Sequence, residues 1–413
     1  MTPNPRKAPR KTSRFRPPTP HETSYQFIQT DEALRAYLRS VQSAEWLAID
    51  TEFISEGRHS AELCLVQAAT FAGPVLIDPL AIRDMTPFWE FLCSGILVIA
   101  HSCRSELEFC ARAIGRLPKR LYDVQLAAGF VAEDYPLSFK RITDIFLRLD
   151  LPKGETRSDW HHRPLSLLQV EYALNDVHYL HDLAELLTNK MLRLGRYDWF
   201  LEETSSYLNR LTETFGDNRW TRLGGITSMT PLELAVVREL WRWREKKAET
   251  LNRPTARILR DDLIVELVRC KTADPERIAL LRGIAKRNDL AMLLEELPVV
   301  IRRAMSLPYS QLPEPPVREN IPHYSVAVQF LMTVLLNRTQ QQRIALNLLA
   351  SAQDVREFLA FRQGTLPAGI TARLDTGWRK IFLNGLLDSV LNGHVALKIS
   401  DFTKTDPLDT VEL

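Results

Sequence analysis

Cysteine is scarce in this sequence, and its pattern excludes two classes of small scaffold. The five cysteines are odd in number, which argues against a disulfide framework, and no Cys-x-x-Cys pair is present to build a zinc ribbon. They are Cys64, Cys93, Cys103, Cys110 and Cys270. Such a pattern is typical of a reducing compartment, so a cytoplasmic location is expected.

The chain also lacks long apolar runs and a strong net charge. No run approaches the roughly 20 residues of a membrane span, and no hydrophobic segment follows the basic, proline-rich N-terminus, so neither a membrane anchor nor a signal peptide is predicted. Residues 1–22 are expected to form a disordered basic tail. Because 53 Lys and Arg residues nearly balance 51 Asp and Glu residues, any surface for a polyanion must be local.

The length of 413 residues exceeds what one hydrophobic core usually serves, so two or three domains are expected. Short apolar runs early in the chain predict buried strands at 46–50, 62–70, 74–80 and 96–102. Amphipathic patterns then predict helices at about 104–115, 122–132, 138–148 and 166–190. This order is typical of a mixed sheet flanked by helices, and it predicts an α/β domain over residues 23–205.

The rest of the chain is predicted to be helical. Its expected parts are a linker at 206–225, a compact all-α domain at 226–305, a proline-dense linker at 306–323 and a C-terminal helical region at 324–413. Thr230, Pro231 and Glu233 supply an N-cap, a proline at the first helical position and a capping-box acid. They predict the start of the first long helix in the all-α domain.

Two carboxylates lie two residues apart at the end of the first apolar run. In a strand, residues i and i+2 point to the same face, so Asp50 and Glu52 share one side of the predicted strand. Burying two acids together is unfavourable unless cations neutralise them, which favours hard ions such as Mg²⁺ or Mn²⁺. A pair of exposed strand-end acids is the alternative that this spacing alone leaves open.

Tyr172 and Asp176 lie four residues apart, so on a helix they share a face. They follow a run that contains Ser158, Asp159, Trp160, Arg163, Pro164, Leu165 and Gln169. This pattern resembles the ribonuclease D family of DEDDy 3′–5′ exonucleases. The resemblance extends in order through DTEF (50–53), LCLVQ (63–67), LIDPL (76–80), AHS (100–102) and LYDVQLAAGF (121–130).

The resemblance implies a ribonuclease H-like exonuclease domain, an enzyme that hydrolyses phosphodiester bonds with two divalent ions, Mg²⁺ or Mn²⁺. The implied metal ligands are Asp50, Glu52, Glu106 and Asp176. Tyr172 is expected to orient the attacking water, because an ordinary tyrosine pKa near 10 makes it a poor base at neutral pH. Thr51 and Phe53, within the same motif, are expected to contact the nucleic acid.

Glu106 is where the sequence departs from the family pattern, which has aspartate at this position. Glutamate adds one methylene, roughly 1.5 Å of reach, and a metal displaced by about 1 Å can cost on the order of 100-fold in rate. Neighbouring acids are poorer substitutes: Glu108 would project to a different side of the helix, and Asp123 is expected to be a helix cap. Glu106 therefore stays the expected fourth ligand.

Residues 239–267 resemble the HRDC domain that follows the nuclease domain in ribonuclease D and is also found in RecQ helicases. Trp241 continues an apolar stripe and is expected in the core. The basic residues expected to bind nucleic-acid phosphates are Arg242, Arg244, Lys246, Lys247, Arg253 and Arg257. A merely solvated helix face is the alternative. The region 324–413 is expected to be either a second, divergent HRDC-like module or a packing domain.

The expected function is a metal-dependent 3′–5′ exoribonuclease that acts as a monomer on the single-stranded 3′ ends of structured RNA, such as tRNA precursors. RNA is favoured by the resemblance alone, because contacts to a 2′-hydroxyl cannot be seen in sequence. Two alternatives stay open. Glu106 is compatible with a nucleic-acid-binding protein whose nuclease site is impaired, and metal chemistry that does not read the sugar is compatible with a DNA 3′–5′ exonuclease.

Overall fold

The computed structural model describes residues 24–152, 158–215, 219–314, 321–404 and 406–413. The tail predicted at residues 1–22 lies outside the described residues, as does part of the proline-dense linker predicted at 306–323. None of the helices within the described ranges combines the length and the hydropathy that a bilayer crossing requires.

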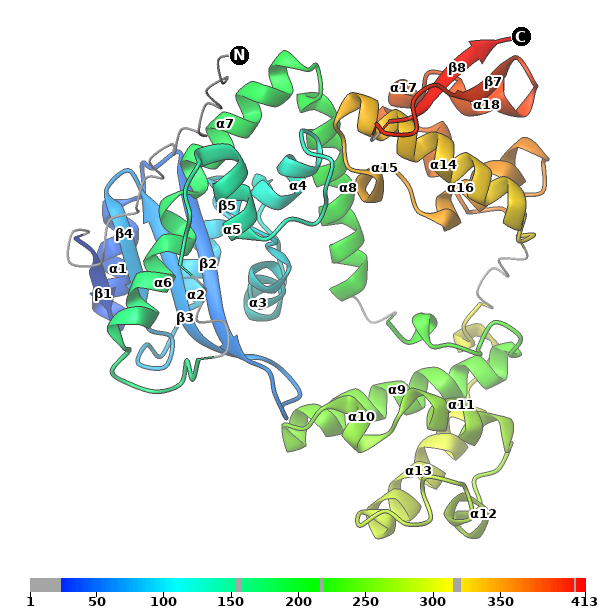
Figure 1. Cartoon of the computed structure of the whole chain (residues 1–413). Helices are drawn as coiled ribbons and strands as arrows, with labels where there is room; N and C mark the ends of the chain where they lie inside the picture. The colour runs from blue at the N-terminus through cyan, green and yellow to red at the C-terminus, as the bar shows by residue number, and fades with distance from the viewer. Residues whose placement is uncertain (1–23, 153–157, 216–218, 315–320, 405) are drawn as a thin grey trace, which may run out of the picture.

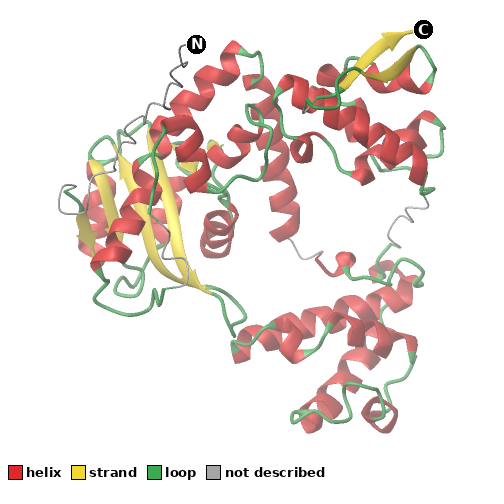
Figure 2. Ribbon diagram, viewed as in Figure 1, coloured by secondary structure: helices red, strands yellow, loops and turns green. Residues whose placement is uncertain are grey.

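A six-stranded mixed sheet forms the centre of the first domain (Figure 1, Figure 2). The strands are β1 (Gln26–Ile28), β2 (Trp46–Ile54), β3 (Glu62–Thr70), β4 (Gly73–Ile77), β5 (Leu97–Ala100) and β6 (Leu121–Asp123). Their order is β1-β4-β3-β2-β5-β6, with β3 antiparallel to both β2 and β4 and the other neighbours parallel. The mixed sheet is confirmed, and the four predicted strands correspond to β2 to β5.

Alternating side chains of β2 are buried on opposite faces of this sheet. Leu47 and Ile49 join the core under α1, α2 and α3, whereas Trp46 and Ala48 join the core under α4, α7 and α8. The helices are α1 (Asp31–Ser40), α2 (Thr86–Leu92), α3 (Arg104–Ile114), α4 (Val124–Gly129), α5 (Phe139–Ile142), α6 (Leu167–His178), α7 (Leu180–Arg193) and α8 (Tyr197–Phe215), with a π-helical turn η1 (Thr143–Leu147) after α5. This alternation brings every second β2 side chain to the same face.

Two helical boundaries differ from the predicted ones. The helix predicted at 166–190 is divided at Tyr179 into α6 and α7. Helix α8 continues past residue 205, so the first part of the predicted linker 206–225 is helical. The reason is tertiary: Leu211 of α8 is buried in the core under α1, α2 and α3.

The second region is all-α and has a hydrophobic core of its own. It contains η2 (Arg219–Arg222), α9 (Pro231–Leu251), α10 (Thr255–Ile258), α11 (Asp261–Arg269), α12 (Pro275–Ala279) and α13 (Leu290–Met305). The predicted start of α9 is confirmed, because Thr230 and Glu233 form a reciprocal capping box and Pro231 is the first helical residue. Trp241 lies in the core of this region, as predicted.

The C-terminal region is helical as far as Leu391 and then ends in a β-hairpin. After η3 (Tyr309–Gln311) it contains α14 (Ser325–Gln342), α15 (Leu346–Leu349), α16 (Ala352–Arg362), η4 (Arg373–Asp375), α17 (Gly377–Leu383), α18 (Leu386–Leu391), β7 (Val395–Ile399) and β8 (Leu408–Glu412). The antiparallel pair β7–β8 corrects the purely helical expectation for 324–413. A tertiary contact holds β8 in place: the Asn337 side chain of α14 donates to the C=O of Leu408 and accepts from its backbone N–H.

The C-terminal region shares its hydrophobic core with the first domain. One continuous cluster of buried residues runs from Trp46 in β2 to Leu387 in α18. At its centre, Glu203 of α8 accepts hydrogen bonds from Arg379 at 2.7 Å and from the Trp378 indole at 3.1 Å. Burial alone would raise the pKa of Glu203, but the Arg379 guanidinium lowers it to about 2. This packing favours the packing-domain alternative for residues 324–413.

Candidate active site

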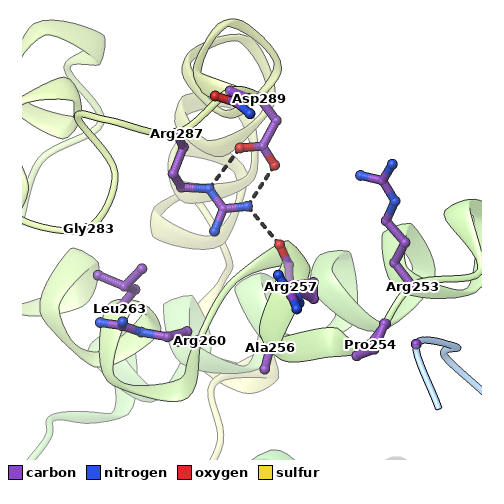
Figure 3. A pocket seen from close by; sticks show the side chains of 11 residues that line it. Arg253, Pro254, Ala256, Arg257, Arg260, Leu263, Gly283, Arg287 and Asp289 are labelled. Carbon is purple, nitrogen blue, oxygen red and sulfur yellow. Dashed lines mark hydrogen bonds and ion pairs between the residues drawn. The ribbon is translucent and has the colours of Figure 1, made fainter. Parts of the chain in front are cut away.

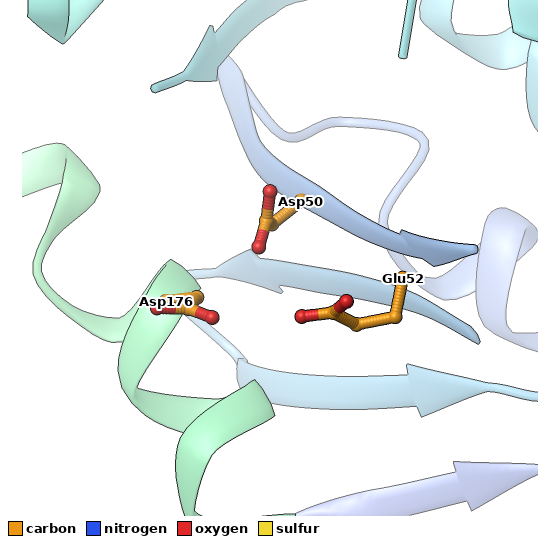
Figure 4. Close-up of side chains that lie close together, drawn as sticks. All are labelled: Asp50, Glu52 and Asp176. Carbon is orange, nitrogen blue, oxygen red and sulfur yellow. The ribbon is translucent and has the colours of Figure 1, made fainter. Parts of the chain in front are cut away.

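Three acids converge where β2 passes under α6 (Figure 4). Asp50 and Glu52 lie on the same face of β2, as their spacing predicts, and Asp176 lies on α6. One carboxylate oxygen from each of them lies within 4.8 Å of the others. No Lys or Arg side chain forms a salt bridge with any of the three in the described part of the chain. Their negative charges are therefore left for an external cation.

The protonation of these acids reflects the same lack of a cation. Burial, followed by the charges of Asp176 and Glu106, raises the pKa of Glu52 to about 8. Burial also raises the pKa of Asp176 to about 7, although hydrogen bonds with Tyr172 and Asp50 oppose the shift. The pKa of Asp50 lies well above its usual value for the same reasons, burial first and then the neighbouring acids. Three clustered carboxylates of this kind fit a hard divalent cation with oxygen ligands.

Helix α6 is held over the sheet by the segment that precedes it. The Arg163 guanidinium forms a two-point ion pair with buried Asp78 after β4, at 2.8 Å for each contact, and donates to the Cys64 carbonyl at 2.6 Å. Ser166 and Gln169 form a capping box at the start of α6, and the Gln169 amide also donates to the Asp159 carbonyl at 3.1 Å. These contacts fix the position from which α6 presents Asp176.

Tyr172 lies on α6 one turn before Asp176, on the same face of the helix. Burial, and then the charges of Asp176, Glu52 and Asp50, raise the pKa of Tyr172. A phenol in this environment stays neutral at physiological pH. It can therefore hydrogen-bond and orient a water molecule, but it cannot act as a phenolate base.

The structure does not bring Glu106 into the group of three acids. Glu106 is buried, with 4% of its surface exposed, and its carboxylate accepts a hydrogen bond from the Thr51 hydroxyl at 2.5 Å. Burial raises the pKa of Glu106 to about 7, against the lowering effect of that hydrogen bond. Its charge still raises the pKa of Asp50 and Glu52, so it lies near the site.

The same hydrogen bond corrects the expectation for Thr51. Its side chain is on the opposite face of β2 from Asp50, is 7% exposed, and is turned to Glu106, so it has no free surface for a nucleic acid. Phe53 is partly exposed and packs edge-on against Phe109, with ring centroids 5.5 Å apart. The cap predicted for Asp123 is confirmed, because its carboxylate accepts from the backbone N–H groups of Gln125 and Leu126.

A cleft of about 830 Å³ joins the surroundings of the acids to the second region. Phe53 and Ser105, the chain neighbours of Glu52 and Glu106, line one end, and Trp241 lines the other. Its charged lining residues are Arg104, Arg112, Arg219, Arg222, Arg244, Glu108 and Glu245. Because arginines outnumber acids here, the cleft favours an anionic ligand.

A second basic pocket, of about 720 Å³, lies on the all-α region (Figure 3). Gly57 of the β2–β3 loop also lines this pocket. Arg287 pairs with Asp289 at 2.6 Å and donates to the Arg257 carbonyl at 2.8 Å, which fixes the wall of the pocket. The side chains of Arg253 and Arg257 are exposed and have no ion pair among the described residues. They are thus available to an anion.

The other basic residues predicted to bind nucleic acid differ in availability. Arg244 is 5% exposed, donates to the Leu259 carbonyl at 3.1 Å and pairs with Asp261, so the prediction for it is corrected. The reason is its position on the buried stripe of α9. Lys247 pairs with Glu296 at 2.6 Å and Arg242 with Glu239 at 3.1 Å, whereas exposed Lys246 has no ion pair within the described ranges.

We expect the metal-free protein to melt at a progressively lower temperature as the pH rises from about 5 to about 8.5. The folded-state pKa values of Glu52, Glu106 and Asp176 are raised, so these groups stabilise the fold when protonated, and that contribution is lost as the pH passes through about 7 to 8. Added Mn²⁺ should reverse the trend, because it binds the charged carboxylates.

Differential scanning fluorimetry with EDTA or with Mn²⁺ measures both effects. Glu52→Gln should flatten the metal-free dependence and weaken the response to Mn²⁺. A metal-free melting temperature that rises over this pH range would contradict the assignment of these raised pKa values.

Two regions of the chain match known protein families, and relatives match it over most of its length. Residues 25–192 match a sequence model described as 3′-5′ exonuclease, and residues 233–288 match one described as HRDC domain. The curated ribonuclease D of Jannaschia sp. (strain CCS1) is 30% identical over 382 residues, which cover 90% of this chain and 96% of the relative. That of Acidiphilium cryptum (strain JF-5) is 30% identical over 385 residues, covering 92% and 96%.

A solved structure extends the likeness to three dimensions. The crystal structure of Escherichia coli RNase D, described as an exoribonuclease involved in structured RNA processing, aligns with a TM-score of 0.74 at 26% sequence identity. The alignment covers 90% of this chain and 99% of that chain. The likeness therefore includes the all-α and C-terminal regions as well as the domain that carries the acids.

Proposed function

The chain belongs to the ribonuclease D family and is a 3′–5′ exonuclease, and we propose that it shortens RNA from the 3′ end by metal-dependent hydrolysis. The observation that carries the proposal is the cluster of Asp50, Glu52 and Asp176 without a cationic partner in the described chain. The names of the relatives, ribonuclease D, and the structured-RNA processing stated for the Escherichia coli protein support RNA as the substrate.

Asp50, Glu52 and Asp176 would hold the divalent ions, and Glu106 would complete the set from the Thr51 side. When bound, Mg²⁺ or Mn²⁺ supplies a Lewis acid that lowers the pKa of water and neutralises charge at the scissile phosphate. Tyr172, as a neutral phenol, would orient the attacking water.

The proposed domains have different roles. The catalytic residues lie in the domain proposed at 23–205, and the HRDC domain proposed at 226–305 binds the RNA upstream of its 3′ end. The basic cleft and the Arg253–Arg257 pocket support this division, because phosphate contacts position a nucleic acid without reading its sequence. Single-stranded 3′ ends of structured RNA precursors, tRNA among them, are the proposed substrates.

We also propose that the protein acts as a monomer in the cytoplasm. The free thiols of all five cysteines fit a reducing compartment.

The test is a degradation assay with 5′-labelled RNA and DNA of the same sequence, in Mg²⁺, Mn²⁺ or EDTA. A ladder of stepwise shortened RNA with either metal, and none in EDTA, is expected. Equal shortening of DNA would replace the RNA proposal by a DNA exonuclease. RNA binding without any shortening would favour the second candidate, a nucleic-acid-binding protein with an impaired site, for which the placement of Glu106 outside the group of three acids is the specific observation.

Replacing Arg253 and Arg257 together by alanine should weaken the binding of long RNA, whatever its sequence. The slope of log Kd against the logarithm of the salt concentration should fall by about two, one for each lost phosphate contact. Turnover of a short oligonucleotide should change little, because the acids are unaffected. Fluorescence anisotropy in EDTA at several salt concentrations measures the binding. Arg277→Ala, on α12 outside the pocket, is the matched control. An unchanged salt slope in the double variant would remove this pocket from the proposed RNA path.

A further inference from the structure

Gln67 is a buried amide beside the acids that no described contact explains. It lies on β3 with none of its surface exposed. Neither its amide nitrogen nor its amide oxygen has a hydrogen-bond partner in the described part of the chain. An amide removed from water without a partner costs stability, so such a group is usually replaced unless a ligand or a second state of the protein uses it.

The register of the sheet places Gln67 next to the metal site. Gln67 is the direct cross-strand partner of Asp50 in the antiparallel β2–β3 pair. Side chains directly opposite in such a pair lie on the same face, with Cβ atoms about 5 Å apart. Helix α6, which carries Asp176, packs over both strands. Gln67 therefore lies on β3, on the same face of the sheet as Asp50, under α6.

A second buried polar atom without a hydrogen-bond partner lies on α6, the helix that packs over this face of the sheet. Asp176 Oδ2 is buried and lacks a hydrogen-bond partner among the described residues. The Gln67 amide on β3 and the Oδ2 atom of Asp176 on α6 are thus both buried and unpartnered among the described residues, on two elements that pack against each other. Ligands of a metal need such outer partners, because a carboxylate that is hydrogen-bonded from behind keeps its orientation when it binds the ion.

We propose that Gln67 is a positioning residue for the metal-binding acids: its amide nitrogen donates to the carboxylates of Asp50 and Asp176 when these act as metal ligands, and so fixes their orientation. This inference rests on the proposed metal site. It predicts that the Gln67 amide strengthens metal binding and lowers the stability of the metal-free protein.

The test compares Gln67→Met with wild type, because methionine keeps the length of the side chain and removes its polar atoms. Free Mn²⁺ is followed by electron paramagnetic resonance, and metal-free stability by thermal unfolding in EDTA. Gln67→Met should bind Mn²⁺ about tenfold more weakly while its metal-free melting temperature is equal to or above that of wild type. With RNA, kcat should fall and KM should stay the same.

Tyr37→Phe is the matched control. The Tyr37 hydroxyl is also buried without a partner in the described chain, but it lies on α1, on the other face of the sheet. Its removal should affect metal-free stability as Gln67→Met does and leave Mn²⁺ affinity at the wild-type value.

The outcomes separate the inference from the proposed function. Wild type that binds no Mn²⁺ would overturn the metal site itself. Wild-type Mn²⁺ affinity in Gln67→Met would overturn only the role of Gln67. If Gln67→Met and the milder Gln67→Asn both fail to fold in EDTA, Gln67 is a core residue and the inference is also overturned.

Discussion

Asp50→Ala is expected to lower the rate of RNA hydrolysis by about 1000-fold or more and to leave RNA affinity almost unchanged. Burial, and then the charges of Asp176, Glu106 and Glu52, raise the pKa of Asp50 well above its usual value. Its removal would delete a proposed metal ligand. The Lewis-acid stabilisation lost with it is expected to be worth several kcal/mol of transition-state energy, where each 1.4 kcal/mol is about tenfold in rate. Single-turnover kinetics with excess enzyme measure the rate, and anisotropy measures the affinity.

Glu185→Ala provides the control for this result, because Glu185 is an exposed acid on α7 outside the cluster. It should hydrolyse RNA at the wild-type rate. If Asp50→Ala retained even a tenth of the wild-type rate, Asp50 would not be a ligand of the catalytic ions, and the remaining acids would have to be reassigned.

Glu106→Asp is expected to slow turnover with Mg²⁺ by about 10- to 100-fold, although it restores the side chain that the resemblance leads one to expect at this position. The carboxylate of Glu106 is buried and bonded to the Thr51 hydroxyl at 2.5 Å, so the cleft is built around the longer side chain. Shortening it by roughly 1.5 Å would break that bond, and a displacement of about 1 Å at a reacting centre can cost on the order of 100-fold.

Thr51→Val tests the same contact from the other side, because it removes the hydroxyl and keeps the acid. It should slow turnover in the same direction as Glu106→Asp. A rate increase in Glu106→Asp would instead show that glutamate misplaces a metal in the wild type. Absence of hydrolysis in the wild type and in Glu106→Asp, with RNA still bound, would support the binding-protein alternative.

Local features were predictable from the sequence because they depend on residues close together in the chain. The period of two in WLAID predicts that Asp50 and Glu52 share a face, and the structure has this arrangement. The spacing of Tyr172 and Asp176 on α6 and the capping box of Thr230 are of the same kind. Each of these predictions rests on the geometry of a single helix or strand.

Features that depend on tertiary contacts were not predictable in the same way. The direction of Glu106 is set by Thr51, 55 residues away in the chain. The edge strands β1 and β6 are too short, at three residues each, to show a period. Arg244 is different, since it lies three residues after Trp241 and four before Ala248 on the buried stripe of α9, and its burial could have been inferred from that spacing.

The core that the nuclease domain shares with the C-terminal region has a consequence for biosynthesis. The all-α region closes its own core with residues no later than Ala304, whereas the cluster that contains Trp46 requires residues as far as Leu387. A ribosome delivers the chain from its N-terminus, so apolar surface on α4, α7 and α8 stays uncovered while the all-α region can already fold. A nascent or prematurely terminated chain that carries every acid of the site would thus still expose apolar surface that the full-length chain buries.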